Sequence, residues 1–237
     1  MKSRVYIIIP FLNESGNILK QLKSILKILK KEKKFFFKVI LVDDASEDGG
    51  YDLVKNFLKK NKLNNIHLVK NKFNMGKTSS LKVGLNQIKS KNLDDFIIFM
   101  DGDFQDNPND IPKFLKMTNQ KYDLVIGKQE KNYNIFIKIS SKIYKYILKI
   151  TLNMNLNTPS PQFLLVKFRF IKNFNFIKNY HRYIAIYSIF NGANHIEIKV
   201  KYLKRKYGKS KFSKFKIFSA FFEIINFIYM LRTKKIN

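Results

Sequence analysis

The chain has 237 residues, 45% of them apolar, and a formal net charge of +29. This length and composition suffice for one substantial hydrophobic core and exclude two large independent domains. Because the chain contains no cysteine, disulfide frameworks and thiolate metal sites are excluded as well. A basic start followed by only a short apolar run before Pro10 predicts a first strand and no signal peptide.

The positive charge is concentrated in the second half of the chain. Residues 1–130 carry 24 Lys and Arg against 15 Asp and Glu, whereas residues 131–237 carry 22 against 2. A surface of this charge attracts nucleic acid and anionic lipid alike through its long-range field. We find no basic-aromatic motif of the kind that binds nucleic acid, and long apolar stretches accompany the charge. We therefore expect a membrane surface as a partner and no nucleic acid.

Short apolar runs rich in Val and Ile alternate with amphipathic stretches through the first 130 residues. The runs predict strands at Val5–Ile9, Val39–Val42, Ile66–Val69, Phe96–Met100 and Leu124–Ile126. Apolar spacing of three and four residues predicts helices at Ile18–Leu29, Asp52–Leu58 and Lys77–Ile88, and another after Asn107-Pro108. Asn13 is the expected N-cap of the first helix. This alternation predicts an α/β fold with a mainly parallel central sheet flanked by helices.

Two further amphipathic stretches are predicted in the basic half. Between residues 135 and 150, apolar side chains gather on one side and lysines on another; the apolar set is Ile135, Ile139, Ile143, Tyr146, Ile147 and Ile150, and the lysines are Lys138, Lys142, Lys145 and Lys149. This pattern fits a helix lying on a membrane or a core-facing helix with a solvated lysine face. The 15 residues Ile217–Leu231 are too few for the roughly 20 that span a bilayer. We expect them to lie in the membrane interface or on a partner, with a terminal core helix as the alternative.

The most informative segment is Asp101-Gly102-Asp103, where a buried apolar strand ends in clustered carboxylates. Two carboxylates one residue apart on a continuing strand point to opposite faces, so Gly102 is expected to let the backbone turn until both converge. Their hard oxygen atoms suit Mg²⁺ or Mn²⁺, which neutralise a nucleotide diphosphate. The segment therefore predicts a metal site, with a solvated turn as the plain alternative.

Four polar motifs in succession resemble those of glycosyltransferase family 2. Residues 8–14 (Ile-Ile-Pro-Phe-Leu-Asn-Glu) resemble the family's I-V-P-x-x-N-E, and residues 42–49 resemble its V-D-D-x-S-x-D-G. Residues 74–85 resemble N-x-G-K-x-x-A-L-x-x-G, and residues 101–108 resemble D-A-D-L-Q-D-P-P. The resemblance covers residues 4 to about 216. It implies the GT-A fold of enzymes that use nucleotide-diphosphate sugars, and especially the branch of dolichol-phosphate mannose synthase and bacterial polyprenyl-phosphate glycosyltransferases.

This resemblance and the chemistry of the side chains assign expected roles. The nucleotide-sugar-binding residues are expected to be Pro10, Asn13, Glu14, Asp43, Asp44, Gly76, Lys77 and Asp101. Asp43 and Asp44 end a strand and can accept hydrogen bonds from the base and ribose. Gly76 and Lys77 open a helix, whose N–H groups and dipole favour an anion. Asp103 is the expected principal metal ligand, with Asp101 and Gln105 completing the shell.

The basic half carries the resemblance to the branch. Residues 181–184 resemble its R-F-I-P motif, and residues 200–211 resemble V-x-x-x-x-R-x-x-G-x-S-K. The residues expected to bind the acceptor phosphate and the diphosphate are Lys128, Lys131, Arg182, Arg205, Ser210 and Lys211. Arg205 and Lys211 join Asp101 and Asp103 as the expected catalytic groups. Two positions depart from the branch: Gly127-Lys128-Gln129 replaces G-x-R, and residues 158–164 lack both the acid and the arginine of D-x-x-x-G-F-R.

Together these observations predict a GT-A domain over residues 1–211, with a nucleotide-sugar half (1–130) and an acceptor and membrane-proximal half (131–211), followed by an amphipathic basic helix (212–237). The expected reaction is metal-dependent, inverting transfer from a UDP- or GDP-sugar to a polyprenyl phosphate, by an enzyme attached peripherally to the cytoplasmic membrane face. One alternative is transfer to a glycan or lipid hydroxyl, which needs a general base. Another is a non-catalytic, membrane-associated scaffold that retains the fold.

Overall fold

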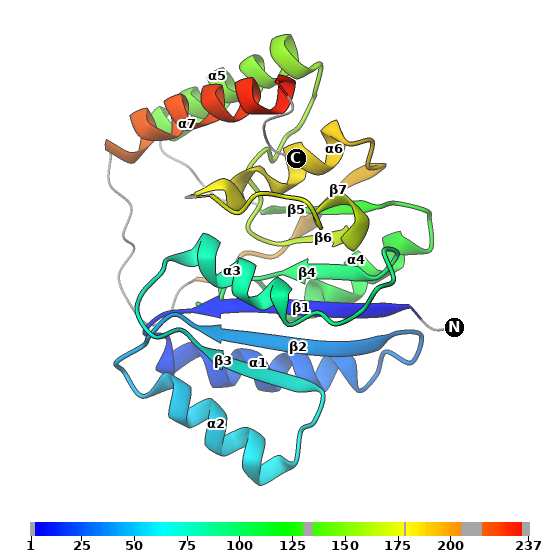
Figure 1. Cartoon of the computed structure of the whole chain (residues 1–237). Helices are drawn as coiled ribbons and strands as arrows, with labels where there is room; N and C mark the ends of the chain where they lie inside the picture. The colour runs from blue at the N-terminus through cyan, green and yellow to red at the C-terminus, as the bar shows by residue number, and fades with distance from the viewer. Residues whose placement is uncertain (1–2, 130–134, 178, 205–214, 234–237) are drawn as a thin grey trace.

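The computed structural model describes residues 3–129, 135–177, 179–204 and 215–233. Its centre is a seven-stranded sheet with the order β3-β2-β1-β4-β6-β5-β7 (Figure 1). The strands are β1 (Arg4–Phe11), β2 (Phe36–Asp43), β3 (Ile66–Lys70), β4 (Phe96–Phe99), β5 (Leu124–Gln129), β6 (Leu164–Lys167) and β7 (His195–Val200). Within this sheet β6 runs antiparallel to both of its neighbours, β4 and β5, and the other pairings are parallel. The predicted α/β fold with a mainly parallel sheet is confirmed.

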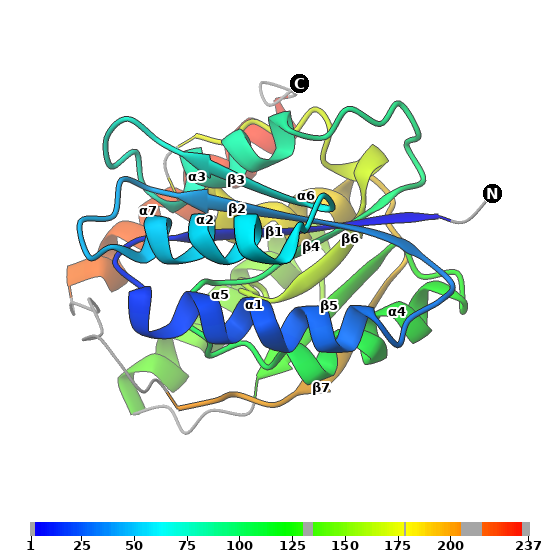
Figure 2. The same cartoon turned by 90° about the horizontal axis from the view of Figure 1, so that it is seen from below.

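Helices cover both faces of the sheet. They are α1 (Ser15–Leu29), α2 (Gly50–Asn61), α3 (Lys77–Asn86), α4 (Ile111–Thr118), α5 (Ile135–Leu152), α6 (Ile184–Phe190) and α7 (Phe215–Arg232), with short 3₁₀ turns η1 (Pro108–Asp110), η2 (Phe168–Phe170) and η3 (Tyr180–Tyr183). Successive residues of a strand point to opposite faces. Accordingly Val5, Ile7 and Ile9 join the core under α1, α2 and α4, whereas Tyr6 and Ile8 join the core under α3, α6 and α7. Figure 2 shows α1, α2 and α4 on the same face.

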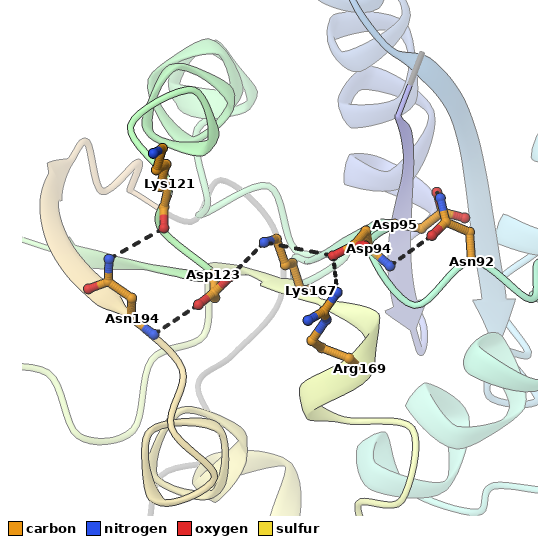
Figure 3. Close-up of polar contacts among 8 residues, drawn as sticks. All are labelled: Asn92, Asp94, Asp95, Lys121, Asp123, Lys167, Arg169 and Asn194. Atoms are coloured by element: carbon orange, nitrogen blue, oxygen red, sulfur yellow. Dashed lines mark hydrogen bonds and ion pairs between the residues drawn. The ribbon is translucent and has the colours of Figure 1, made fainter. Parts of the chain in front are cut away.

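Ion pairs surround the C-terminal end of the antiparallel strand β6, at the end of the sheet where β4 and β5 begin (Figure 3). Lys167, at the end of β6, lies 2.7 Å from Asp123 and 3.9 Å from Asp94, which precede β5 and β4 respectively. Arg169 also pairs with Asp94. The backbone N–H groups of Lys167 and Phe168 donate to the carbonyls of Asp123 and Asp95, both at 2.8 Å. This edge lies at the start of β4 and β5, opposite the end at which Asp101 follows β4.

The predicted strands and helices of the first 130 residues are present, but the predicted cap of the first helix is wrong. Glu14, not Asn13, is the N-cap of α1. Asn13 has a positive φ of 55°, and its side-chain oxygen accepts a hydrogen bond from the N–H of Glu47 at 2.9 Å. The Asn13 side chain therefore bonds to the loop after β2, and it makes no capping hydrogen bond to α1.

The amphipathic stretches of the basic half form α5 and α7, which pack against each other (Figure 1). Leu148 of α5 is fully buried, and α7 buries Ile224, Phe227 and Leu231 in the core. Four residues of the predicted apolar stripe of α5 are exposed, namely Ile139, Ile143, Tyr146 and Ile150, whereas Ile147 packs against the core. The core-facing alternative is therefore wrong for those four residues but holds for Ile147, and α7 also contributes one face to the core. Within the described parts of the chain, no helix has the length and apolar character needed to cross a bilayer.

Candidate active site

The loops that follow β1 and β2 are bound to each other at the carboxyl end of the sheet. Pro10 lies within β1, opposite Val42 in the register with β2. The N–H of Asn13 donates to Ser46 Oγ at 2.9 Å. Glu14 is buried at the start of α1 and accepts a hydrogen bond from Asn17 Nδ2 at 2.7 Å. The contact with Ser46 places Asn13 beside the loop after β2, and Glu14 follows it directly in the chain.

Asp43 and Asp44 are both buried, and each holds a turn. The Asp43 carboxylate accepts the N–H of Ser46 at 3.2 and 3.3 Å. Asp44 accepts from Asn71 Nδ2 at 2.8 Å, from the N–H of Met75 at 2.9 Å and from the N–H of Gly76 at 2.8 Å. Asp44 therefore fixes the loop that precedes α3, a contribution that the sequence did not reveal.

Lys77 connects that loop to the end of β4. Gly76, the N-cap of α3, has a φ of +80°, a conformation that glycine adopts without steric cost. Lys77 follows as the first residue of α3, and its ammonium forms an ion pair with Asp101 Oδ1. The same ammonium donates to Gln162 Oε1 at 2.6 Å. A small pocket here is lined by Lys77, Asp101, Pro161, Gln162, His181 and Ile184, among others.

The Asp101–Asp103 turn needs glycine for a different reason from the one predicted. Gly102 has no positive φ; the left-handed residue of this loop is Phe104, with a φ of 61°. A Cβ atom on Gly102 would lie 2.6 Å from Phe11 Cβ and 3.0 Å from the carbonyl oxygen of Pro10. Glycine is thus required because the loop passes close to the backbone of β1.

The rest of the carboxylate loop contacts the segment after β7. Asp103 Oδ1 accepts the N–H of Gln105 at 3.1 Å. The side-chain amide of Gln105 donates to the Tyr202 hydroxyl. The backbone carbonyl of Gln105 accepts the N–H of Leu203 at 2.9 Å. The segment predicted to close over the diphosphate therefore begins directly beside the predicted metal ligands.

Asp106 is a buried member of the same loop that the sequence analysis did not assign to the site. One carboxylate oxygen accepts the N–H of Asp101 at 3.1 Å, and the other accepts Gln129 Nε2 at 2.6 Å. Burial and the neighbouring Asp101 charge raise the pKa of Asp106 to about 7. Its place within the motif Asp101–Pro108 was the available signal.

The carboxylates suit a divalent ion held jointly with a substrate. Within the described ranges, no group of three or more His, Cys, Asp and Glu side chains could hold a metal ion on its own. Asp101 and Asp103 nevertheless supply hard oxygen atoms from one turn. Mg²⁺ commonly binds through one or two carboxylates plus substrate phosphates and water. These residues therefore fit a metal ion whose shell the donor diphosphate completes.

The residues expected to bind acceptor are only partly described. Lys128 is half-buried on β5. Arg182 Nη1 lies 3.8 Å from Glu223 Oε2 of α7, which links η3 to that helix. Lys131, Arg205, Ser210 and Lys211 lie outside the described residues.

Sequence reasoning also missed a contact between α3 and η3. His181 Nδ1 lies 2.7 Å from Thr78 Oγ1, next to Lys77. Burial, with Lys77 and Arg182 nearby, holds the pKa of His181 well below its ordinary value, so the imidazole is neutral. No local pattern predicts such a contact, because the two residues come from separate parts of the chain.

The mainly parallel α/β sheet, with carboxylates on the loops after β1, β2 and β4, has the GT-A fold. Residues 6–180 match the family model described as glycosyl transferase family 2, and the chain belongs to this family. It is a glycosyltransferase, as the sequence predicted.

Two relatives and one solved structure illustrate the similarity. An uncharacterised protein of Methanocaldococcus jannaschii is 29% identical over 236 residues, covering 94% of this chain and 98% of that protein. The undecaprenyl-phosphate 4-deoxy-4-formamido-L-arabinose transferase of Edwardsiella ictaluri is 24% identical over 223 residues, covering 93% of this chain and 66% of the transferase. This chain thus spans about two thirds of that transferase's length. The structure of a Pyrobaculum calidifontis mannosyltransferase in complex with GDP-Man and Mn²⁺ superposes with a TM-score of 0.63 at 16% identity, covering 89% of this chain and 59% of that one.

Proposed function

We propose that this glycosyltransferase moves a sugar, with inversion, from a UDP- or GDP-sugar to a polyprenyl phosphate at the cytoplasmic face of a membrane. The observation that carries the proposal is the position of Asp101 and Asp103. They follow β4 directly, beside Lys77 at the start of α3. Carboxylates for a cation and a helix start for an anion thus meet at the end of the sheet where open α/β folds bind ligands.

In this proposal the donor lies across the ends of β1, β2 and β4. Pro10, Asn13, Glu14, Asp43, Asp44, Gly76 and Lys77 line or support the nucleotide site. Asp103, Asp101 and Gln105 hold Mg²⁺ or Mn²⁺, which supplies neutralising charge for the leaving diphosphate. The Pyrobaculum mannosyltransferase, with GDP-Man and Mn²⁺ bound, supports this choice of donor and ion.

The acceptor oxygen belongs to a phosphate and is already anionic near neutral pH, so transfer needs no general base. Catalysis then consists of positioning and charge stabilisation by Asp101, Asp103, Arg205 and Lys211. Lys128, Lys131, Arg182 and Ser210 complete the set proposed to bind the diphosphate and the acceptor phosphate. The name of the Edwardsiella relative supports a polyprenyl phosphate as acceptor.

Peripheral membrane attachment is proposed through an apolar band on α5 and α7. The band consists of Ile139, Ile143, Tyr146 and Ile150 on α5 and Phe222, Ile225 and Tyr229 on α7, all between 46% and 70% exposed. Exposed lysines, among them Lys138, Lys142 and Lys149, flank it. Apolar side chains bordered by lysines suit the headgroup region of a bilayer, and lysine is attracted to the anionic cytoplasmic leaflet.

The apolar band is joined to the active site through η3. The Tyr180 and Tyr183 rings pack on Phe227 of α7, with ring centroids 5.2 and 4.5 Å apart. Between them, His181 lines the pocket that contains Asp101. A lipid phosphate at the bilayer surface would therefore lie beside the proposed acceptor half of the chain (131–211), near α7, the described helix of the proposed C-terminal amphipathic segment (212–237).

The experiment is a transfer assay across UDP- and GDP-sugars with Mn²⁺ or Mg²⁺, with and without undecaprenyl phosphate in detergent. We expect metal-dependent nucleotide release that rises when the lipid is added and falls at least a hundredfold in Asp103→Asn. Asp52→Asn, an exposed change on α2, is the matched control and should leave release unchanged. Release that responds only to hydroxyl acceptors would refute the polyprenyl phosphate and favour the alternative acceptor.

A further inference from the structure

One lysine lies against the carboxylates that the proposed function assigns to a metal ion. The Lys77 ammonium pairs with Asp101 Oδ1 and donates to Gln162 Oε1 at 2.6 Å. Both members of the ion pair are partly exposed, with 28% of the Lys77 side chain and 27% of the Asp101 side chain accessible. Two acceptors therefore hold the Lys77 ammonium, yet the ion pair remains accessible to incoming ligands.

The charge of Lys77 acts on a dense group of acids. Asp101, Asp103 and Asp106 lie within six residues of sequence. Asp106 accepts the N–H of Asp101 at 3.1 Å, so a buried acid lies next to the residue that pairs with Lys77. An ammonium beside Asp101 and a divalent ion on the same carboxylate repel each other, because like charges a few ångströms apart interact unfavourably.

We propose that Lys77 is a resident counter-ion, which neutralises Asp101 before the donor binds and then passes to the donor diphosphate when metal ion and nucleotide enter together. The inference rests on the proposed function and adds to it a coupling between the two ligands. Lys77 opposes binding of the metal alone and favours binding of the metal with a diphosphate. By linkage, each ligand then raises the affinity for the other.

The position and chemistry of Lys77 suit such a transfer. Its charge stands on a flexible four-carbon stem, so it can move without moving the backbone. It is the first residue of α3, where backbone N–H groups and the helix dipole also favour an anion. The lysine and the helix start thus serve the same diphosphate.

Gln162 departs from the motif that this part of the chain resembles. It occupies the glycine position of the branch's D-x-x-x-G-F-R motif, so a side chain absent from that pattern reaches Lys77. As a neutral acceptor, Gln162 holds the ammonium near Asp101 without adding a second negative charge. Removing the Gln162 side chain should weaken the hold on Lys77 near Asp101 while keeping the positive charge of the lysine.

The test measures Mn²⁺ binding to the full chain by electron paramagnetic resonance, with and without UDP or GDP. Without nucleotide, Lys77→Met should bind Mn²⁺ about three- to fivefold more tightly than the native chain, the range expected for removing a partly exposed ion pair. With nucleotide, its affinity for the Mn²⁺–nucleotide pair should fall about tenfold. Gln162→Ala should tighten Mn²⁺ binding in the same direction by about twofold and keep nucleotide affinity. Lys82→Met, an exposed lysine further along α3, removes the same charge and should change neither.

If Lys77→Met bound Mn²⁺ no more tightly than Lys82→Met without nucleotide, the counter-ion role would be refuted, although nucleotide-dependent Mn²⁺ binding by the native chain would leave the proposed function standing. If the native chain bound no Mn²⁺ even with nucleotide, the proposed function and this inference would both fail. Circular dichroism reports whether Lys77→Met folds. Should it not fold, Gln162→Ala decides alone, and unchanged Mn²⁺ affinity in that variant would overturn the proposal.

Discussion

Replacing Asp44 by Asn distinguishes two roles of this residue, fixing the loop before α3 and binding the nucleotide directly. The sequence alone cannot tell them apart. The carboxylate accepts three hydrogen bonds, two from backbone N–H groups of the loop before α3 and one from Asn71. An amide keeps one oxygen and turns an NH₂ group toward a remaining donor, so at least one partly buried N–H loses its carboxylate acceptor. Hydrogen bonds to a charged group contribute about 1.5–3 kcal/mol.

Asp44→Asn should therefore lower the free energy of unfolding by about 2–3 kcal/mol in the absence of any ligand. For a chain of this size, that corresponds to a fall in Tm of about 4–12 °C. The assay is thermal unfolding followed by circular dichroism, with Asp52→Asn as the control, since Asp52 is exposed. An unchanged Tm combined with lost nucleotide affinity would refute the loop-fixing role and make Asp44 a direct nucleotide ligand.

Three further changes test other parts of the structure. Ile143→Asp in the apolar band should weaken binding to anionic vesicles about tenfold in a sedimentation assay, while Leu53→Asp, equally exposed on α2, should not; equal losses would remove the band as the membrane contact. The pKa of Asp106 is higher in the folded chain than in the unfolded chain, so the folded chain holds a proton on Asp106 that the unfolded chain loses. This proton binding stabilises the folded chain fully below about pH 4. The stabilisation is lost as the pH rises toward 7. Urea unfolding should show this decline, at most about 4 kcal/mol, flattened in Asp106→Asn; an unchanged slope would contradict it. Lys167→Met leaves Asp123 without its 2.7 Å ion pair and should cost about 1–2 kcal/mol with unchanged transfer, whereas lost transfer would tie this edge to the active site.

The parts of the fold that follow local patterns were predictable from the sequence. Val5–Ile9 is a continuous apolar run, and such a run in an alternating strand–helix chain can only be a buried parallel strand. The strand is longer in the structure, Arg4–Phe11, because backbone pairing with β2 continues past both ends of that run. The motif Asp101–Pro108 likewise lies beyond the carboxyl end of β4, as the alternation of strands and helices predicts.

The parts that depend on distant partners were not predictable. Asn13 has the propensity of an N-cap, but Glu47 takes its side chain. The four residues of β6 carry too little pattern to reveal a strand, and their antiparallel placement comes from backbone pairing with β4 and β5, which are distant in the sequence. The contact between Lys77 and Gln162 joins residues 85 positions apart, and only the folded chain brings them together.

In the proposed function, the carboxylates after β4 support sugar transfer to a lipid phosphate. The most direct test of this function is mass-spectrometric detection of a sugar-linked polyprenyl phosphate after incubating the chain with the donor panel, Mn²⁺ and undecaprenyl phosphate. We predict a product that forms with the native chain and with Asp52→Asn and disappears with Asp103→Asn or a chelator. A product that persists in Asp103→Asn, or nucleotide-bound protein that yields no lipid-linked sugar from any donor, would contradict the account.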